Sequence, residues 1–283
     1  MYSGGISTMA ATLIEFEKRG PVAEIRLNRP EKLNAINSIM VDELGSALDQ
    51  AELDENIRVI LLSGNGRAYS AGFDLDMGNP QEGMSESEFI GQELKRSFDL
   101  IMRFWDCPKP TIAAVHGYCL GSAMEISTVC DITIAADDCR FGAPEVRFGS
   151  GIVCMILPWV VGLKNANEIL LEGSTRIDAG RAQAIGLINR VVPAANLMDE
   201  ARSLAGELSL NDPLAVRLTK KAIRRTVEIA GMRQALAEAL KLAIEIEMTD
   251  TPESRTFNNI LASDGPKAAL AWRAAQRPDF KKQ

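Results

Sequence analysis

The sequence predicts an α/β fold. Short, continuous runs of β-branched and other apolar residues alternate with segments of helical periodicity through the first half of the chain. Strands of that kind are typical of sheets whose faces are covered by helices. After about Leu157 the strand signals nearly vanish, and helical patterns continue to the end. With 283 residues and no long linker or internal repeat, the chain has the length of one large domain, or of one domain with an appendage.

The first elements expected are a β-hairpin and a helix. Two alternating apolar-rich runs, Thr12–Phe16 and Val22–Leu27, are separated by Lys18-Arg19-Gly20-Pro21, a sequence typical of a turn. Asn37 or Ser38 is a suitable N-cap for a helix that runs to about residue 54. The apolar positions of this helix recur at helical spacing: Met40, Val41, Leu44, Leu48 and Ala51.

Three more strands and one long helix are expected in the first half. The continuous apolar runs Ile57–Leu62, Thr111–Val115 and Ile132–Ala136 predict strands of the buried type. Asp76–Ser85 is rich in glycine, proline and polar residues, which predicts a loop, and Glu86–Trp105 then has the pattern of a helix.

Composition and charge exclude several classes of protein. The net charge of −7 argues against a nucleic-acid partner, which calls for a basic surface. No apolar run reaches the length of a membrane span, and residues 1–11 lack the pattern of a signal peptide. The five cysteines show no metal-type spacing and their odd count argues against a disulfide framework, so we expect reduced thiols and a cytoplasmic location.

Two glutamates stand out because each closes a turn punctuated by glycine. Glu125 ends the stretch that begins at His116, and Glu145 ends the stretch that begins at Cys139. Two carboxyl groups in one small site can share a water molecule and divide the acid and base roles between them. Taken alone, either glutamate has the alternative interpretation of a surface carboxylate.

Four segments together resemble the motifs of the enoyl-CoA hydratase/isomerase, or crotonase, superfamily, in the family's order. They are Leu27–Asn37, Gly66–Leu75, His116–Glu125 and Phe141–Glu145. The resemblance implies a crotonase-like spiral of ββα units, with a core over residues 1–200. It also implies a C-terminal helical region over residues 201–283 that aids assembly into a trimer.

The resemblance implies an oxyanion hole formed by the backbone N–H groups of Phe73 and Ser122. Gly72 precedes the first donor, and glycine allows a backbone to approach a ligand closely. Gly121 precedes the second, at the start of an expected helix whose first N–H groups have no helical partner. Losing one such donor typically costs about 10²–10³ in rate. The alternative is that these are ordinary turn glycines.

The resemblance also implies where coenzyme A is held. Arg29 and Lys32 are candidates for contact with its phosphates, with a solvated surface as the alternative for each. The better candidates are main-chain groups, because the family holds adenine and pantetheine there. They belong to Ala71, Gly72, Phe73, Asp74, Leu75 and Gly121.

Other polar residues are assigned structural roles. His116 is the single histidine, and the chain has no Gly-x-Ser-x-Gly turn that a serine hydrolase would need, so a packed role is expected. A helix is expected to begin at Asp212-Pro213, and it carries a basic cluster. We expect this cluster to lie on a solvated face of the helix. The cluster comprises Lys220, Lys221, Arg224 and Arg225.

The sequence departs from the family pattern after the second glutamate. Hydratases of the family usually carry Pro-Gly-x-Gly-Gly there, whereas this chain has Gly149–Ile156, in which Ile152 and Val153 replace the usual Pro-Gly. A bulkier and more apolar pocket wall is expected.

The function that the resemblance implies is hydration of a 2-enoyl-CoA to a 3-hydroxyacyl-CoA, with Glu125 and Glu145 as catalytic residues. No metal and no redox cofactor is expected, since coenzyme A is part of the acyl-CoA thioester substrate. The partners expected are this substrate and further copies of the chain, in a homotrimer or a dimer of trimers, and neither nucleic acid nor membrane. A double-bond isomerase and a non-catalytic acyl-CoA-binding protein are the alternatives.

Overall fold

The computed structural model describes residues 12–76, 78–173 and 175–276, and its strands form two sheets. The larger sheet is parallel throughout except for the antiparallel pair β1–β2 at its edge. Its strand order is β1 (Ile14–Arg19), β2 (Val22–Leu27), β3 (Val59–Gly64), β4 (Thr111–Val115), β6 (Ile132–Ala136) and β9 (Arg190–Val192). The predicted hairpin and the three predicted buried strands are therefore confirmed.

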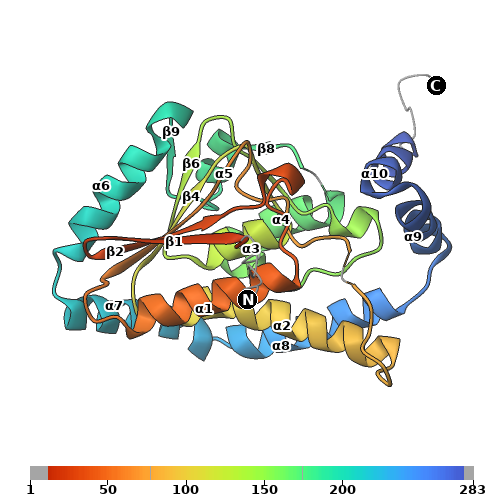
Figure 1. The fold of residues 1–283 in the computed structure, drawn as a ribbon, viewed down its shortest axis with the longest axis horizontal. Coiled ribbons are helices and arrows are strands. Elements are labelled where there is room, and N and C mark those ends of the chain that lie inside the picture. The colour runs from red at the N-terminus through yellow and green to blue at the C-terminus, as the bar shows by residue number, and fades with distance from the viewer. Residues whose placement is uncertain (1–11, 77, 174, 277–283) are drawn as a thin grey trace, which may run out of the picture.

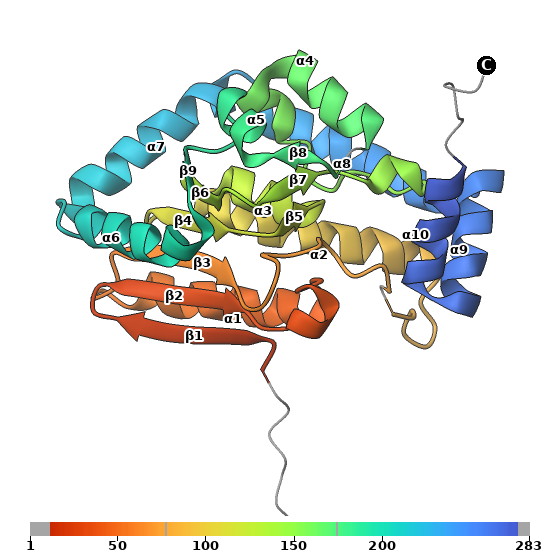
Figure 2. The same ribbon diagram turned by 90° about the horizontal axis from the view of Figure 1, so that it is seen from above.

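The smaller sheet contains β5 (Tyr118–Leu120), β7 (Arg140–Gly142) and β8 (Ile177–Asp178). The chain alternates between the two sheets, since β4 leads into β5 and then α3 (Ser122–Val129). It repeats the path when β6 leads into β7 and, after a loop, α4 (Leu157–Glu172). This repetition is the predicted spiral of ββα units, and Figure 2 shows its successive turns stacked side by side.

Helices cover both faces of the larger sheet (Figure 1). Side chains alternate along each strand, so Ile60 and Leu62 of β3 enter the larger apolar cluster while Val59 and Leu61 enter the smaller. The larger cluster includes side chains of α1 (Ser38–Leu53), α2 (Glu86–Asp106) and α3. The smaller cluster is closed by α6 (Leu197–Ser209).

The two predicted N-terminal helices begin where the sequence places their caps. The side chain of Asn37 accepts a hydrogen bond from the backbone N–H of Met40, which caps α1. Ser85 and Glu88 form a reciprocal capping box at the start of α2. Between these helices, the expected loop over residues 76–85 contains no strand or helix in its described part, and residue 77 lies outside the described residues.

A helical series follows, as predicted, although the division near residue 200 stays a prediction. It comprises α5 (Ala179–Ala184), α6, α7 (Pro213–Ile229), α8 (Met232–Met248), α9 (Pro252–Asp264) and α10 (Pro266–Ala275). Helix α8 lies along α2, while α9 and α10 pack together at one end of the molecule (Figures 1 and 2). In the part of the chain that the structure describes, no helix combines the length and apolarity needed to cross a bilayer.

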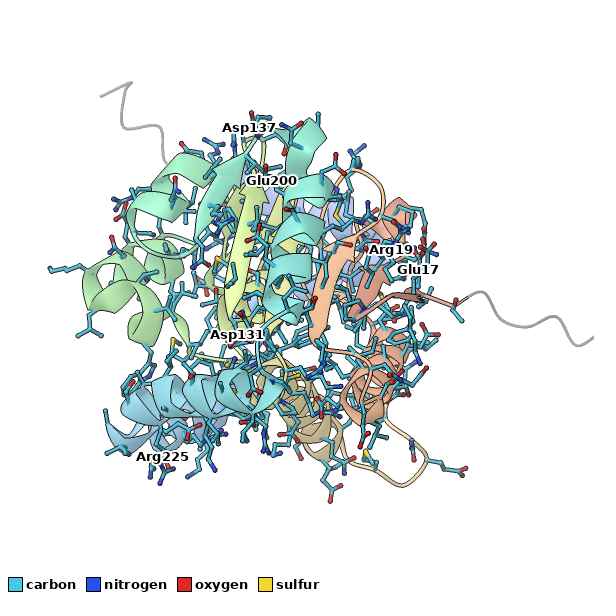
Figure 3. The ribbon with its side chains drawn as sticks, turned by 90° about the vertical axis from the view of Figure 1, so that its left-hand side faces the viewer. Glu17, Arg19, Asp131, Asp137, Glu200 and Arg225 are labelled. Atoms are coloured by element: carbon cyan, nitrogen blue, oxygen red, sulfur yellow. The ribbon has the colours of Figure 1, made fainter. Side chains whose placement is uncertain are left out.

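The predicted solvated face of α7 is wrong for two of its four cations. Lys220 and Arg224 are each only 8% exposed, and both pair with Asp131 at distances of 2.6 and 2.8 Å. The guanidinium of Arg224 also lies 4.5 Å from the ring centre of Trp105. Figure 3 shows Asp131 between the sheet and the helices below it, with Arg225 on their outer side. The charge pattern of α7 alone does not reveal this partner, because Asp131 lies directly before β6 in a distant part of the sequence.

Candidate active site

Three parallel chain segments end at the same edge of the smaller sheet. Strands β5 and β7 are paired so that Leu120 lies opposite Gly142. A third segment runs beside β5, because Ser70 N–H donates to the carbonyl of Tyr118 at 3.0 Å and Leu120 N–H donates to the carbonyl of Ser70 at 3.1 Å. The residues that follow the three segments therefore meet at one edge, where ligands of parallel sheets commonly bind.

Gly72 and Gly121 bring two of these segments into close contact. Both glycines have positive φ, 95° and 55° respectively. A Cβ atom on Gly72 would lie 2.8 Å from the carbonyl oxygen of Leu120 and 3.4 Å from the backbone nitrogen of Ser122. Glycine is required here both for the backbone conformation and for the space.

The backbone N–H groups of Phe73 and Ser122 follow these glycines. Among the described residues, neither N–H has a hydrogen-bond acceptor. The neighbouring amides are bonded, since Ile36 N–H donates to the carbonyl of Gly72 and Asp74 N–H donates to the carbonyl of Ile36. Ser122 is the first residue of α3, so its N–H lies at the positive end of the helix dipole. Two donors suited to an anionic oxygen thus lie on adjacent segments.

Glu125 lies one turn into α3 and is 4% exposed. Its Oε1 accepts a hydrogen bond from the backbone N–H of Cys154 at 3.1 Å, while its Oε2 is buried with no partner in the described residues. Burial, followed by the negative charge of Glu145, raises the pKa of Glu125 well above its usual value. This carboxyl group therefore favours the protonated form.

Glu145 begins the short helix η2 (Glu145–Arg147) directly after β7 and two connecting residues. A Cβ atom on Gly121 would lie 2.2 Å from Oε1 of Glu145, so this carboxyl group lies against the glycine that precedes Ser122. Its Oε2 has no partner among the described residues. Burial raises the pKa of Glu145 to about 7, and the negative charge of Glu247 contributes. The structure thus brings the two glutamates together beside the two amides.

The residues expected to hold coenzyme A lie in two settings. Ala71 and Leu75 are half-buried in the loop around Phe73, whereas Lys32 is exposed at the end of the short helix η1 (Pro30–Lys32). Arg29 is engaged within the chain, because its Nη1 pairs with the carboxylate of Asp74 and donates to the carbonyl of Ala35 at 3.0 Å. That pairing ties the loop that carries Phe73 to the preceding segment.

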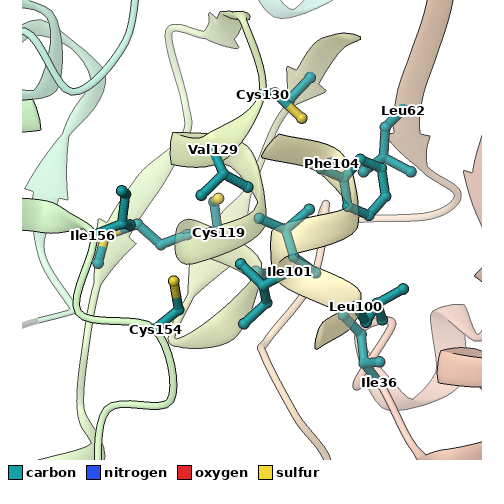
Figure 4. Close-up of a cluster of buried hydrophobic side chains, with 14 of the residues drawn as sticks. Ile36, Leu62, Leu100, Ile101, Phe104, Cys119, Val129, Cys130, Cys154 and Ile156 are labelled. Atoms are coloured by element: carbon teal, nitrogen blue, oxygen red, sulfur yellow. The ribbon is translucent and has the colours of Figure 1, made fainter. Parts of the chain in front are cut away.

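The loop after Glu145 supplies contacts that the sequence did not reveal. Ile152 and Val153 are buried in the larger apolar cluster, and the expected apolar pocket wall stays a prediction. Figure 4 shows the Cys154 side chain in that cluster, while its backbone N–H holds Glu125. The buried hydroxyl of Ser122 also has no partner in the described residues. Main-chain donors and a serine hydroxyl carry no distinctive sequence signal.

His116 lies between β4 and β5, at the end of β5 opposite to Gly121, and makes a structural contact. Its Nε2 lies 2.9 Å from the carbonyl oxygen of Gly66, which joins the end of β4 to the loop after β3. This contact agrees with the structural role predicted for the histidine.

Comparison with known proteins agrees with the fold. A family model described as enoyl-CoA hydratase/isomerase matches residues 17–256. The short-chain-enoyl-CoA hydratase of Clostridium acetobutylicum is 35% identical over 262 residues, which are 90% of this chain and 91% of that protein. The 2,3-dehydroadipyl-CoA hydratase of Escherichia coli K12 is 30% identical over 278 residues, covering 96% and 99% of the two chains.

A solved structure is also similar along almost its whole length. The crystal structure of an enoyl-CoA hydratase/isomerase from Xanthobacter autotrophicus Py2 has a TM-score of 0.90 and 44% sequence identity, with 94% of this chain and 99% of that chain covered. The family model, the relatives and the shared fold point to one conclusion: the chain belongs to the enoyl-CoA hydratase/isomerase family and is an enzyme of the crotonase superfamily.

Proposed function

We propose that the protein adds water to a 2-enoyl-CoA to give the 3-hydroxyacyl-CoA. One observation supports the proposal: in the described part of the chain, two backbone N–H groups without an acceptor lie beside two carboxyl groups that each keep one buried oxygen unpaired. Amides aimed at one point stabilise an oxyanion, and carboxyl groups exchange protons with water and carbon.

The proposed reaction begins with polarisation of the thioester. Its carbonyl oxygen accepts hydrogen bonds from the N–H groups of Phe73 and Ser122, which draw electrons from the conjugated double bond. One glutamate of the pair Glu125–Glu145 takes a proton from water as the hydroxyl oxygen bonds to the β-carbon. The negative charge then resides on the thioester oxygen as an enolate, and the other glutamate gives its proton to the α-carbon.

The titration of the glutamates suits this division of roles. Two like charges in one buried site do not ionise independently, so the pair holds a proton beyond the pH at which a solvated glutamate has lost it. The pKa of Glu145 is raised to about 7 and that of Glu125 is raised well above its usual value, so the pair is suited to hold one carboxylate and one carboxylic acid.

We propose that coenzyme A is held mainly by main-chain groups of residues 71–75 and by Gly121, with Lys32 free to reach a phosphate at the exposed rim. Addition of water across a carbon–carbon double bond needs no electron acceptor. We therefore propose that the reaction uses no redox cofactor and no metal. The five buried, unpaired thiols support the expectation of a reducing, cytoplasmic location.

The test is incubation of the purified protein with crotonyl-CoA and with longer and aromatic enoyl-CoA esters. We expect the enoyl-thioester absorbance to fall and the product to gain the mass of one water. A product of unchanged mass with a moved double bond would identify an isomerase instead. Saturable binding of the thioesters with no product and no α-proton exchange in deuterated water would refute both activities.

A further inference from the structure

A third carboxylate, from the C-terminal helical region, reaches the loop that follows Glu145. Oε1 of Glu247, near the end of α8, accepts hydrogen bonds from the backbone N–H of Gly151 at 2.9 Å and from the hydroxyl of Ser150. One turn earlier on α8, Ala243 touches the same loop: a Cβ atom on Gly151 would lie 2.7 Å from the Cα atom of Ala243. Helix α8 therefore contacts this loop in two ways, through a close backbone approach and through the hydrogen bonds of a carboxylate.

The loop that α8 contacts, residues 150–154, forms hydrogen bonds with both glutamates of the site. On one side, Ser150 N–H donates to the carbonyl of Glu145 at 3.0 Å, which closes the turn that presents this residue. On the other side, Cys154 N–H donates to Oε1 of Glu125. Glu247 binds between these two contacts. Displacement of the loop after a substitution of Glu247 would therefore alter the positions of both carboxyl groups, because only a few backbone residues separate these contacts.

The charge of Glu247 also acts on the site. It contributes to the raised pKa of Glu145, after burial. Two further charged residues belong to this neighbourhood: Glu125 on α3, whose pKa is raised by the charge of Glu145, and Arg147, two residues along the chain, whose Nε donates to the carbonyl of Glu172 at the end of α4. Because the negative charge of Glu247 raises the pKa of Glu145, loss of that charge is expected to make ionisation of Glu145 easier.

We propose that Glu247 is a positioning residue for the hydration reaction. It fixes the Ser150–Cys154 loop so that the carboxyl groups of Glu125 and Glu145 meet the substrate together. The inference rests on the proposed function and extends it to a side chain of the C-terminal helical region. No contact between Glu247 and substrate is required.

Three substitutions separate the contact from the charge. Glu247→Gln keeps an acceptor oxygen at the same reach and removes the charge. Glu247→Asp keeps the charge but shortens the side chain by one CH₂ group, and Glu247→Ala removes both. We expect kcat to fall about 10- to 100-fold in the aspartate and alanine variants, as for a small misplacement of reacting groups. We expect the glutamine variant to keep most of the wild-type kcat. KM should change less than about threefold in all three variants.

The pH profile distinguishes positioning from a general loss of stability. In Glu247→Gln, the limb of kcat/KM assigned to Glu145 moves to lower pH, whereas in Glu247→Asp it stays near the wild-type position. Glu245→Gln is the matched control, since it removes the same charge from an exposed position on the same helix. This control is expected to leave both kcat and the profile unchanged.

A second readout needs no turnover. Infrared difference spectra follow protonation of the Glu145 carboxyl, which is assigned by the band that Glu145→Gln removes. The inference predicts that this band titrates at lower pH in Glu247→Gln than in the wild type. Wild-type kcat in the aspartate and alanine variants, or an unmoved band in the glutamine variant, would overturn it. If the wild-type enzyme hydrates no enoyl thioester, the proposed function fails, and the infrared titration still decides whether Glu247 acts on Glu145.

Discussion

Burial of Glu125 and Glu145 links the chemistry of the site to its cost in stability. A buried carboxyl group whose pKa is raised in the folded state is harder to ionise there than in the unfolded chain. The folded protein therefore holds protons that the unfolded chain releases. Native stability declines over the pH range in which only the unfolded state ionises, which is the same property that keeps an acid available for catalysis.

We expect Glu145→Gln to lose activity and gain stability. Hydration should fall by about 10²–10⁴, as for loss of a positioned acid or base. The pKa of Glu145 rises from 4.5 to about 7 on folding, so the wild-type protein loses up to about 3 kcal/mol between those pH values, and the variant does not. Thermal unfolding at pH 8 and at pH 4 measures this, with a higher Tm for the variant only at pH 8.

The exposed Glu172, at the end of α4, provides the control. Glu172→Gln should keep wild-type activity and show no pH-dependent gain in Tm. Full turnover by Glu145→Gln would exclude this residue from the mechanism.

The pH dependence of the reaction follows from the same carboxyl group. The pKa of Glu145 is raised to about 7 and that of Glu125 is also raised, so protonation of Glu145 at lower pH removes the base that the proposed reaction needs. We expect kcat/KM for crotonyl-CoA to rise with pH through about 7, and to fall at higher pH when Glu125 also ionises. A profile that is flat from pH 5 to 9 would contradict this assignment.

At the scale of elements, the site depends on strands too short to be recognised in the sequence. The long apolar runs predicted β3, β4 and β6 because four or five buried residues in a row form a distinct pattern. Strands β5, β7 and β8 have only two or three residues, in which no alternation can be counted. Residues such as Gly72, Gly121 and Glu145 could thus be selected from motifs, but their convergence required the pairing of these strands.

Gly121→Ala tests that convergence. A methyl group at this position would collide with Oε1 of Glu145 and would demand a left-handed backbone from alanine. We expect kcat to fall at least 100-fold through displacement of Glu145, with the circular dichroism spectrum unchanged. Gly45→Ala, in the interior of α1 with open space around it, should instead raise the free energy of unfolding by about 0.5–1 kcal/mol. Normal turnover by Gly121→Ala would show that the close approach is not needed.

At the scale of the whole molecule, the last helices are attached by interactions that local patterns do not predict. The amphipathic pattern correctly predicted a helix after residue 212. However, Lys220 and Arg224 point inward and pair with Asp131, which lies far from them in the sequence. Glu247 likewise meets a loop far from it in the chain. Contacts between residues so far apart in the sequence cannot be predicted from the spacing of residues within one helix or loop.

The Asp131 cluster should therefore stabilise the whole fold. Asp131→Ala leaves two buried cations without their carboxylate partner, and we expect the free energy of unfolding, measured in urea, to fall by about 3–5 kcal/mol. Arg225→Ala, at an exposed position on the same helix, should change the free energy of unfolding by less than about 0.5 kcal/mol. Equal effects of the two substitutions would show that the buried cluster contributes little.

Assembly into trimers or hexamers is the expectation for the molecule in solution. Large apolar side chains are exposed on α7 and α8 of the single chain, among them Leu214, Leu218, Leu242 and Ile246. Exposed apolar patches of this kind mark contacts between proteins. Light scattering should give three or six times the 30.8 kDa of one chain. Leu218→Glu should lower that mass, whereas a monomeric wild type would refute the expectation.

The hydrogen bond between Gly151 and Glu247 has a consequence for biosynthesis. It joins residues that are 96 positions apart, and both proton-handling glutamates precede it in the chain. A ribosome that has exposed only the first two hundred residues has already released every group that we propose to contact substrate. If Glu247 holds the loop as we propose, such a nascent chain lacks the contact that positions its two glutamates until α8 has been synthesised.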